Sequence, residues 1–186
     1  MFVKTPLLLL LLLSFDNLYA QKKLNFYGGV HLTTDAELYM TGPSFQAGAS
    51  YYLTSRLSVS GYLHYFAVRR KETSALAGQS NFFFNTVTAA ALFQIDGGRN
   101  PDHGMYYGLG LAFQNLIREY RYSASDEFNE NRNNIVPAAR IGYLFKVKRS
   151  HLGVEINCTG PAGNNVNDVY YFDILTQLSL GLRFVF

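Results

Sequence analysis

The chain has 186 residues, which suits one domain, and its net charge of +3 comes from scattered basic residues that give little support to a nucleic-acid-binding protein. Charged residues make up 16% of the chain, against about 25% in a typical soluble domain. Aromatic residues also reach 16%, and the single cysteine, Cys158, excludes an intramolecular disulfide.

The N-terminus has the pattern of a secretory signal. Lys4 precedes an apolar run over residues 7–13, and the small residue Ala20 ends the segment. This order predicts a cleaved signal peptide over residues 1–20 and a mature, exported chain over residues 21–186. The apolar run is shorter than the roughly 20 residues of a membrane-spanning helix. A buried N-terminal helix is the alternative.

From residue 22 onward the hydrophobic pattern has a period of two, which predicts β-strands and no helix. In each expected strand, large apolar residues occupy one parity, and small or uncharged polar residues occupy the other. The last strand is typical, with Leu182 and Phe184 alternating with Gly181 and Arg183. The eight expected strands cover residues 24–32, 44–53, 57–68, 82–95, 105–119, 136–147, 152–159 and 170–186.

The links between these strands alternate in length. Short or turn-rich links at 54–56, 96–104 and 148–150 alternate with long polar links at 33–43, 69–81, 121–134 and 160–168. An up-and-down meander with turns at one end and loops at the other produces this alternation, which is typical of transmembrane β-barrels. The apolar parity changes across the sixth link, so that turn must have an even number of residues, for instance Lys148 and Arg149.

The small polar parity suits the lumen of an eight-stranded barrel, which side chains just fill, so the large apolar parity is expected to face outward. Aromatic residues near the strand ends then predict two membrane-interface girdles. One girdle comprises Tyr51, Phe93, Tyr107 and Phe145 at the short-turn end, and the other comprises Tyr65, Phe83, Tyr170 and Phe172 at the long-loop end. The alternatives are a soluble lipocalin-like barrel and a sandwich with an aromatic core.

Four charged residues share the lumen parity on three consecutive strands: Arg140, Lys146, Glu155 and Arg183. Charges in a narrow lumen need partners, because an unpaired buried charge costs several kcal/mol. Glu155 lies diagonal to Arg140 or Lys146 in either plausible register, and Arg183 comes from the other neighbouring strand. The pattern predicts an ionic cluster that fills the lumen and has a structural role.

The signal peptide, the eight alternating strands and the final Phe186 resemble the small OmpA/OmpX-type outer-membrane β-barrels over the whole mature chain. The "YAQ" junction and the Tyr-, Phe- and Asn-rich composition resemble the outer membrane protein beta-barrel domain group of the Bacteroidota. The resemblance implies a monomer in the outer membrane of a Gram-negative cell, in contact with lipid and lipopolysaccharide. It also implies that the barrel-assembly machinery reads the stripe of Leu178, Leu180, Leu182, Phe184 and Phe186.

No residue pattern indicates catalysis. None of the four histidines is followed two residues later by serine, as in the lipid A deacylase type, and no helix precedes the first strand, as in the palmitoyltransferase type. No cofactor or metal site is expected, and His31 and His64 are interpreted as lumen filling. Two hypotheses remain: a structural or interaction module whose outer loops, above all residues 121–134, contact a protein or glycan, and a narrow channel or conduit for small ions or apolar solutes.

Overall fold

The computed structural model describes residues 24–35, 40–74, 78–97, 103–121, 127–148, 150–160, 162–166, 169–173 and 177–186. The expected signal peptide, residues 1–20, lies outside these ranges. Every regular element in the described ranges is a β-strand. The same ranges contain no helix that is long and apolar enough to cross a membrane.

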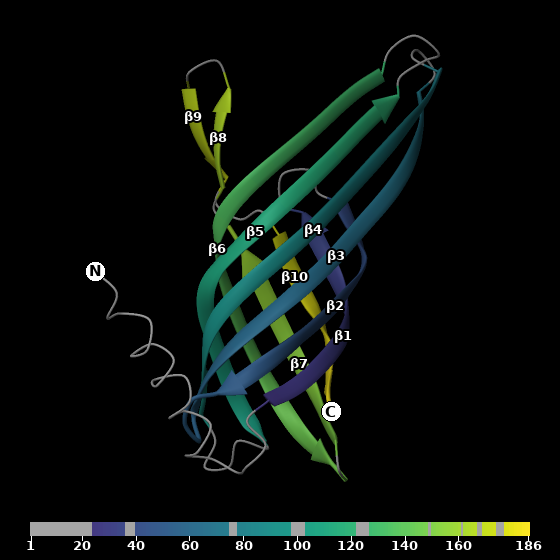
Figure 1. Cartoon of the computed structure of the whole chain (residues 1–186). Helices are drawn as coiled ribbons and strands as arrows, with labels where there is room; N and C mark the ends of the chain where they lie inside the picture. The colour runs from purple at the N-terminus through teal and green to yellow at the C-terminus, as the bar shows by residue number, and fades with distance from the viewer. Residues whose placement is uncertain are drawn as a thin grey trace, which may run out of the picture.

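Eight antiparallel strands close into one barrel, in the order β1-β10-β7-β6-β5-β4-β3-β2 (Figure 1). Strand β1 closes the barrel by pairing with β10 from Tyr27–Val185 to Asp35–Gln177. This confirms the predicted all-β, eight-stranded, up-and-down barrel. The barrel strands are β1 (Leu24–Asp35), β2 (Met40–Tyr52), β3 (Leu57–Ser74), β4 (Gly78–Asp96), β5 (Gly104–Arg121), β6 (Glu127–Val147), β7 (Ser150–Thr159) and β10 (Gln177–Val185).

The large apolar residues face out and the polar residues face in, as predicted. On β10, Leu180 is 53% exposed and its neighbour Ser179 is 4% exposed. The same alternation of exposed apolar and buried small or polar side chains runs along all eight strands. A soluble barrel would bury its large side chains, so this arrangement excludes the lipocalin-like alternative.

The two ends of the barrel differ. At the turn end, Val147 pairs with Ser150, which leaves a two-residue turn, and Lys148 has the positive φ of 57° that such turns favour. The predicted even-length link is therefore confirmed. The chain also ends here, where the Phe186 amide donates to the Phe26 carbonyl at 3.0 Å.

At the loop end, β3, β4, β5 and β6 continue past the closed barrel as a four-stranded extension (Figure 1). Pairing of β2 with β3 ends at Ser44–Phe66, whereas β3 and β4 stay paired to Ser74–Gly78. The predicted loops 69–81 and 121–134 therefore lie largely in strands, which corrects the expectation. Backbone pairing needs no apolar face, so these polar strand ends give no hydrophobic signal.

The predicted last strand, 170–186, is also wrong in its first part. Tyr170 and Phe172 lie in β9 (Val169–Asp173), which pairs with β8 (Ala162–Val166) in a separate two-stranded sheet. Gly160, with φ of 136°, follows the end of β7, and only glycine adopts this conformation without strain. The chain leaves the barrel there, so Tyr170 and Phe172 are not part of its wall.

Candidate functional site

Glu155, on β7, is the centre of a buried network in the half of the lumen nearest the turn end. It is 1% exposed. His31 Nε2 lies 2.9 Å and Gln46 Nε2 3.0 Å from its Oε1, and the Tyr106 hydroxyl donates to Oε2 at 2.7 Å. A carboxylate only accepts, so all three neighbours act as donors.

Two arginines complete the network. Arg140 Nε and Arg183 Nη1 lie 3.5 and 3.6 Å from Glu155 Oε2. Arg140 also donates to Asn157 Oδ1 at 2.7 Å and to the Tyr27 hydroxyl at 3.0 Å. The structure thus brings together three of the four charged residues that were predicted to form the cluster, namely Arg140, Glu155 and Arg183.

The fourth, Lys146, lies elsewhere. It pairs with His151 next to the β6–β7 turn, and its side chain is exposed. The residue of β6 opposite Glu155 is Gly142, and four strand residues separate Lys146 from it by about 13 Å. Lys146 has the lumen parity but sits at the mouth of the barrel.

The network has two guanidinium groups for one carboxylate, and both guanidinium groups lie against the faces of aromatic rings. Arg183 Cζ lies 3.7 Å from the ring centroid of Tyr27 and 5.1 Å from that of Tyr106. Arg140 Cζ lies 4.4 Å from that of Tyr62. Cations are attracted to the faces of such rings, most strongly where water is excluded.

Two glycines make room for this network. Gly142 and Gly181 are the neighbours of Glu155 across the β6 and β10 ladders. A Cβ atom at Gly142 would collide with the ring of Tyr106, and one at Gly181 would collide with the ring of His31. The side chains two strands away from Glu155 therefore reach it across positions that carry no side chain.

Hydroxyl groups fill the next layer toward the loop end. Thr33 Oγ1 lies 2.6 Å from Ser44 Oγ and 2.8 Å from Ser179 Oγ, and His64 Nε2 lies 3.0 Å from Ser44 Oγ. Serine beside histidine is the chemistry of an activated nucleophile, but these side chains are all buried. The adjoining cavity, lined in part by His64 and Ser179, measures about 10 Å³, room for roughly one water molecule.

An apolar cluster closes the loop end of the lumen. It comprises Met40, Phe66, Phe84 and Leu116, and the rings of Phe66 and Phe84 meet edge to face with centroids 5.6 Å apart. This cluster was not predicted from the sequence. All four residues lie on the inward-facing parity of their strands, which elsewhere carries small or polar residues. Large apolar residues on that parity were therefore the sequence feature that could have predicted the cluster.

The outer face is an apolar belt. Leu109 is 69% exposed, and exposed Leu, Val, Ile, Phe and Tyr side chains occur on all eight barrel strands. Along β4 the outward residues from Ile95 to Phe83 span about 40 Å of strand, or about 28 Å of height at a 45° tilt. That height matches the hydrocarbon core of a membrane, about 30 Å.

The remaining predicted girdle residues lie on this face. At the turn end, the four predicted girdle residues are exposed: Tyr51, Phe93, Tyr107 and Phe145. Nearer the loop end, Tyr65 is exposed and Phe83 is half-buried, with Arg69 Cζ 5.0 Å from its ring centroid. The predicted assembly stripe is also exposed along β10 and just beyond it, comprising Leu178, Leu180, Leu182, Phe184 and Phe186.

Metal-ligating side chains do not gather in the described part of the chain, where no group of three or more His, Cys, Asp or Glu could hold an ion. Cys158, which pairs with Leu178 across β7 and β10, is a half-exposed free thiol.

No protein-family model and no curated protein matches the sequence. Solved structures are similar in fold. OprG, an outer membrane protein from Pseudomonas aeruginosa, has a TM-score of 0.59 at 10% identity, covering 88% of this chain and 95% of OprG. Ail, the attachment invasion locus protein of Yersinia pestis, solved with the heparin analogue sucrose octasulfate, has a TM-score of 0.52 at 13% identity, covering 88% and 97%.

Neisserial surface protein A has a TM-score of 0.52 at 12% identity, covering 87% of this chain and 94% of that protein. The chain therefore shares the fold of small outer-membrane barrels, which confirms the resemblance seen in the sequence at the level of the fold. The narrower likeness to the Bacteroidota group stays a prediction.

Proposed function

We propose that this protein is an integral outer-membrane β-barrel of a Gram-negative cell, a non-catalytic anchor that presents its loop end to the surroundings. The observation that carries the proposal is the apolar belt around a closed barrel whose lumen holds the buried charges Arg140, Glu155 and Arg183. In water this belt would be a large exposed apolar surface, whereas in a membrane its side chains contact lipid. Closure also leaves no unpaired strand edge within the hydrocarbon region.

The proposed orientation puts the turn end in the periplasm and the four-stranded extension outside the cell. Short periplasmic turns and longer outer segments are the usual arrangement of such barrels. The export signal at residues 1–20 and the reading of the β10 stripe by the barrel-assembly machinery are parts of the same proposal. A stripe that is accessible on the outer face of the last strand is compatible with such reading.

The closed lumen favours an anchor over a channel. The Glu155 network fills one half and the cluster around Phe66 fills the other, so an ion would have to cross an ionic layer and an apolar layer. Wide aqueous pores belong to barrels of about 16 strands. In planar bilayers we expect no steady conductance from the purified barrel. A steady conductance that is lost on Arg140→Gln would contradict the anchor and support a narrow channel.

The extension is the proposed contact surface, with a protein or an acidic glycan as partner. Arg69, Arg70 and Lys71 are consecutive and exposed on β3, beyond the level at which the barrel closes. Ail, which has the same fold, was solved in complex with a heparin analogue, and this makes a sulfated glycan a suitable first probe. The test is retention of the purified barrel on a heparin column. Retention should fall when Arg69, Arg70 and Lys71 are all replaced by Gln, and it should not fall in Lys148→Asn at the other end of the barrel.

Membrane fractionation with heat-modifiable gel mobility tests the placement. Expressed in a Gram-negative host, the mature chain should be recovered in the outer membrane and migrate faster unboiled than boiled. Recovery from the soluble periplasm would overturn the proposal.

A further inference from the structure

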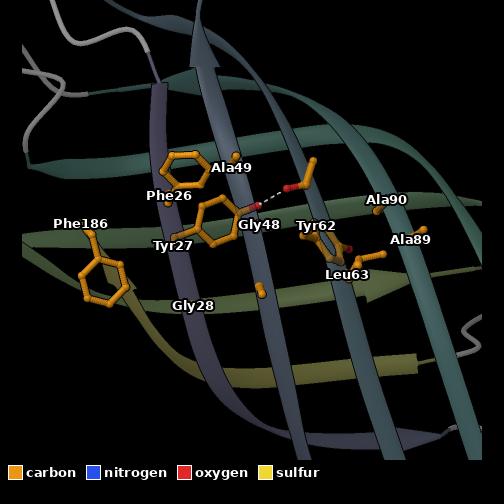
Figure 2. A pocket seen from close by; sticks show the side chains of 12 residues that line it. Phe26, Tyr27, Gly28, Gly48, Ala49, Tyr62, Leu63, Ala89, Ala90 and Phe186 are labelled. Atoms are coloured by element: carbon orange, nitrogen blue, oxygen red, sulfur yellow. Dashed lines mark hydrogen bonds between the residues drawn. The ribbon is translucent and has the colours of Figure 1, made fainter.

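The outer wall is hollowed on one side of the barrel. A depression of about 670 Å³ lies on the outer face of β1, β2, β3 and β4. Figure 2 shows the rings of Phe26 and Phe186 on one side of it and Leu63 on the other. Its floor is formed by small residues, namely Gly28, Ala47, Ala49, Gly61 and Ala89.

The floor follows directly from the strand register. Gly28 pairs with Ala47, Ala49 with Gly61, and Leu63 with Ala89. Small side chains therefore occupy neighbouring outward positions on four adjacent strands. On the opposite wall a row of outward positions carries large residues: Ile141 pairs with Ile156, which pairs with Leu180. The small residues there, Ala139 and Cys158, form a single pair beside this row. The hollow is thus a local feature of one wall and not a property of the whole belt.

The lining of the depression is mainly apolar. The Gly61 carbonyl accepts a hydrogen bond from the Tyr27 hydroxyl at 3.1 Å, from inside the barrel (Figure 2). Most of the remaining lining is hydrocarbon. An unfilled hollow would lose the dispersion contacts of its lining, so an apolar chain is the occupant that this chemistry favours.

A cation marks where the head of such an occupant would lie. Arg56 is exposed in the turn between β2 and β3, the two strands that form the centre of the floor. Gly61 follows Arg56 by five residues, about 16 Å along the strand or about 12 Å of depth at a 45° tilt, which lies within the roughly 15 Å of one leaflet of a 30 Å hydrocarbon core. A phosphate at Arg56 would therefore place its acyl chain beside Gly61.

We propose that this wall binds one phospholipid of the periplasmic leaflet, with an acyl chain in the depression and the phosphate at Arg56. The inference rests on the proposed membrane placement and adds a specific lipid seat to it. The remainder of the belt would contact lipid without selecting it, because it lacks the hollow.

Spin-labelled phosphatidylglycerol in phosphatidylcholine vesicles tests the proposal by electron spin resonance. Ala49→Phe fills the floor, and Ala139→Phe on β6 is the matched control on the opposite wall. Ala49→Phe should remove about one motionally restricted lipid per barrel, and Ala139→Phe none. Arg56→Gln should reduce the preference for phosphatidylglycerol about fivefold, the factor that one basic residue contributes at a membrane surface. Lys148→Asn, in the β6–β7 turn on the other side of the barrel from the depression, should leave the preference unchanged.

Each contrary outcome has a distinct meaning. Equal numbers of restricted lipids in Ala49→Phe and wild type would overturn the acyl seat, and an unchanged lipid preference in Arg56→Gln would overturn the phosphate contact. A change of sedimentation mass in detergent on Ala49→Phe would identify the hollow as an interface between copies instead. Heat-modifiable mobility of the wild type tests the membrane placement separately from the lipid seat. If the wild type inserts but the variants give the contrary results above, the lipid seat is wrong and the membrane placement stands. If the wild type does not insert, both proposals are wrong.

Discussion

The two halves of the lumen have different groups at their centres. Toward the turn end, Glu155 sits between Arg140 and Arg183 and is reached by neutral donors. Toward the loop end, Phe66 and Phe84 pack edge to face. Two buried charged residues border this cluster, Arg118 opposite Phe84 and Asp35 opposite Met40. Buried side chains occupy both halves in the described residues.

The same lumen width places different requirements on the side chains that fill each half. Both halves face a lumen of similar width, which eight strands leave just wide enough for side chains. The ionic half depends on every charge having a partner, since a stranded buried charge is costly. The Phe66 cluster itself depends mainly on shape and volume, although the buried Asp35 and Arg118 lie beside it. The ionic half should therefore be the more sensitive to a single substitution.

The largest effect should come from Glu155→Leu. It strands two buried guanidinium groups, so we expect the free energy of unfolding to fall by about 5 kcal/mol, the upper end of the range for breaking a buried ion pair. Urea unfolding in lipid vesicles, followed by loss of the heat-modifiable band, measures it. Glu119→Gln, an exposed acid on β5, is the control and should change little. Equal effects at the two sites would break the comparison.

Phe66→Ala should cost somewhat less, about 3 kcal/mol, because it removes a fully buried ring and leaves a cavity. The same urea titration applies. Phe45→Ala, whose side chain faces outward, is the control, because lipid refills the space that the ring leaves. A larger loss at Phe45 than at Phe66 would show that the loop-end cluster does not hold the barrel together.

Gly142→Ala should cost about 1 to 3 kcal/mol through overpacking, because the new methyl group collides with the ring of Tyr106. Gly28→Ala meets only the Gln46 carbonyl oxygen at 3.7 Å and is the matched control. If both variants unfold at the wild-type urea concentration, the space beside Glu155 is not needed for the network.

The parity of the strands accounts for what could be predicted. Period two identified eight strands and placed Arg140, Glu155 and Arg183 inside together. The alternation could not show that Lys146 lies at the mouth of the barrel. The position of a residue along the barrel axis depends on strand tilt and register, and the sequence of one strand does not determine these. His31 and Tyr106 reach Glu155 only because Gly142 and Gly181 are bare, a relation between strands distant in sequence.

The loop end was harder to predict for a different reason. The extension of β3 to β6 is polar and pairs through its backbone, so hydrophobic alternation stops before the strands do. Phe66 and Phe84 lie on the parity that elsewhere carries small polar residues. The apolar stripe on the other parity is the stronger pattern, and it concealed them.

The smallest effect should come from Lys146→Gln. Its side chain is exposed at the mouth, and the interactions of exposed charged side chains usually contribute less than about 1 kcal/mol. The contrast with Glu155→Leu, measured in the same titration, sharpens the boundary of the ionic half. A loss of several kcal/mol would mean that the network extends to the rim.

The central claim is that lipid covers the apolar face, and the absence of tryptophan from the chain allows a direct measurement. Single tryptophans are introduced as Leu109→Trp, outside, and Tyr62→Trp, inside, in vesicles whose acyl chains carry bromine. We expect strong quenching of the tryptophan at 109 and weak quenching of the one at 62. Quenching of 62 with 109 unaffected, or of neither, would contradict the claim.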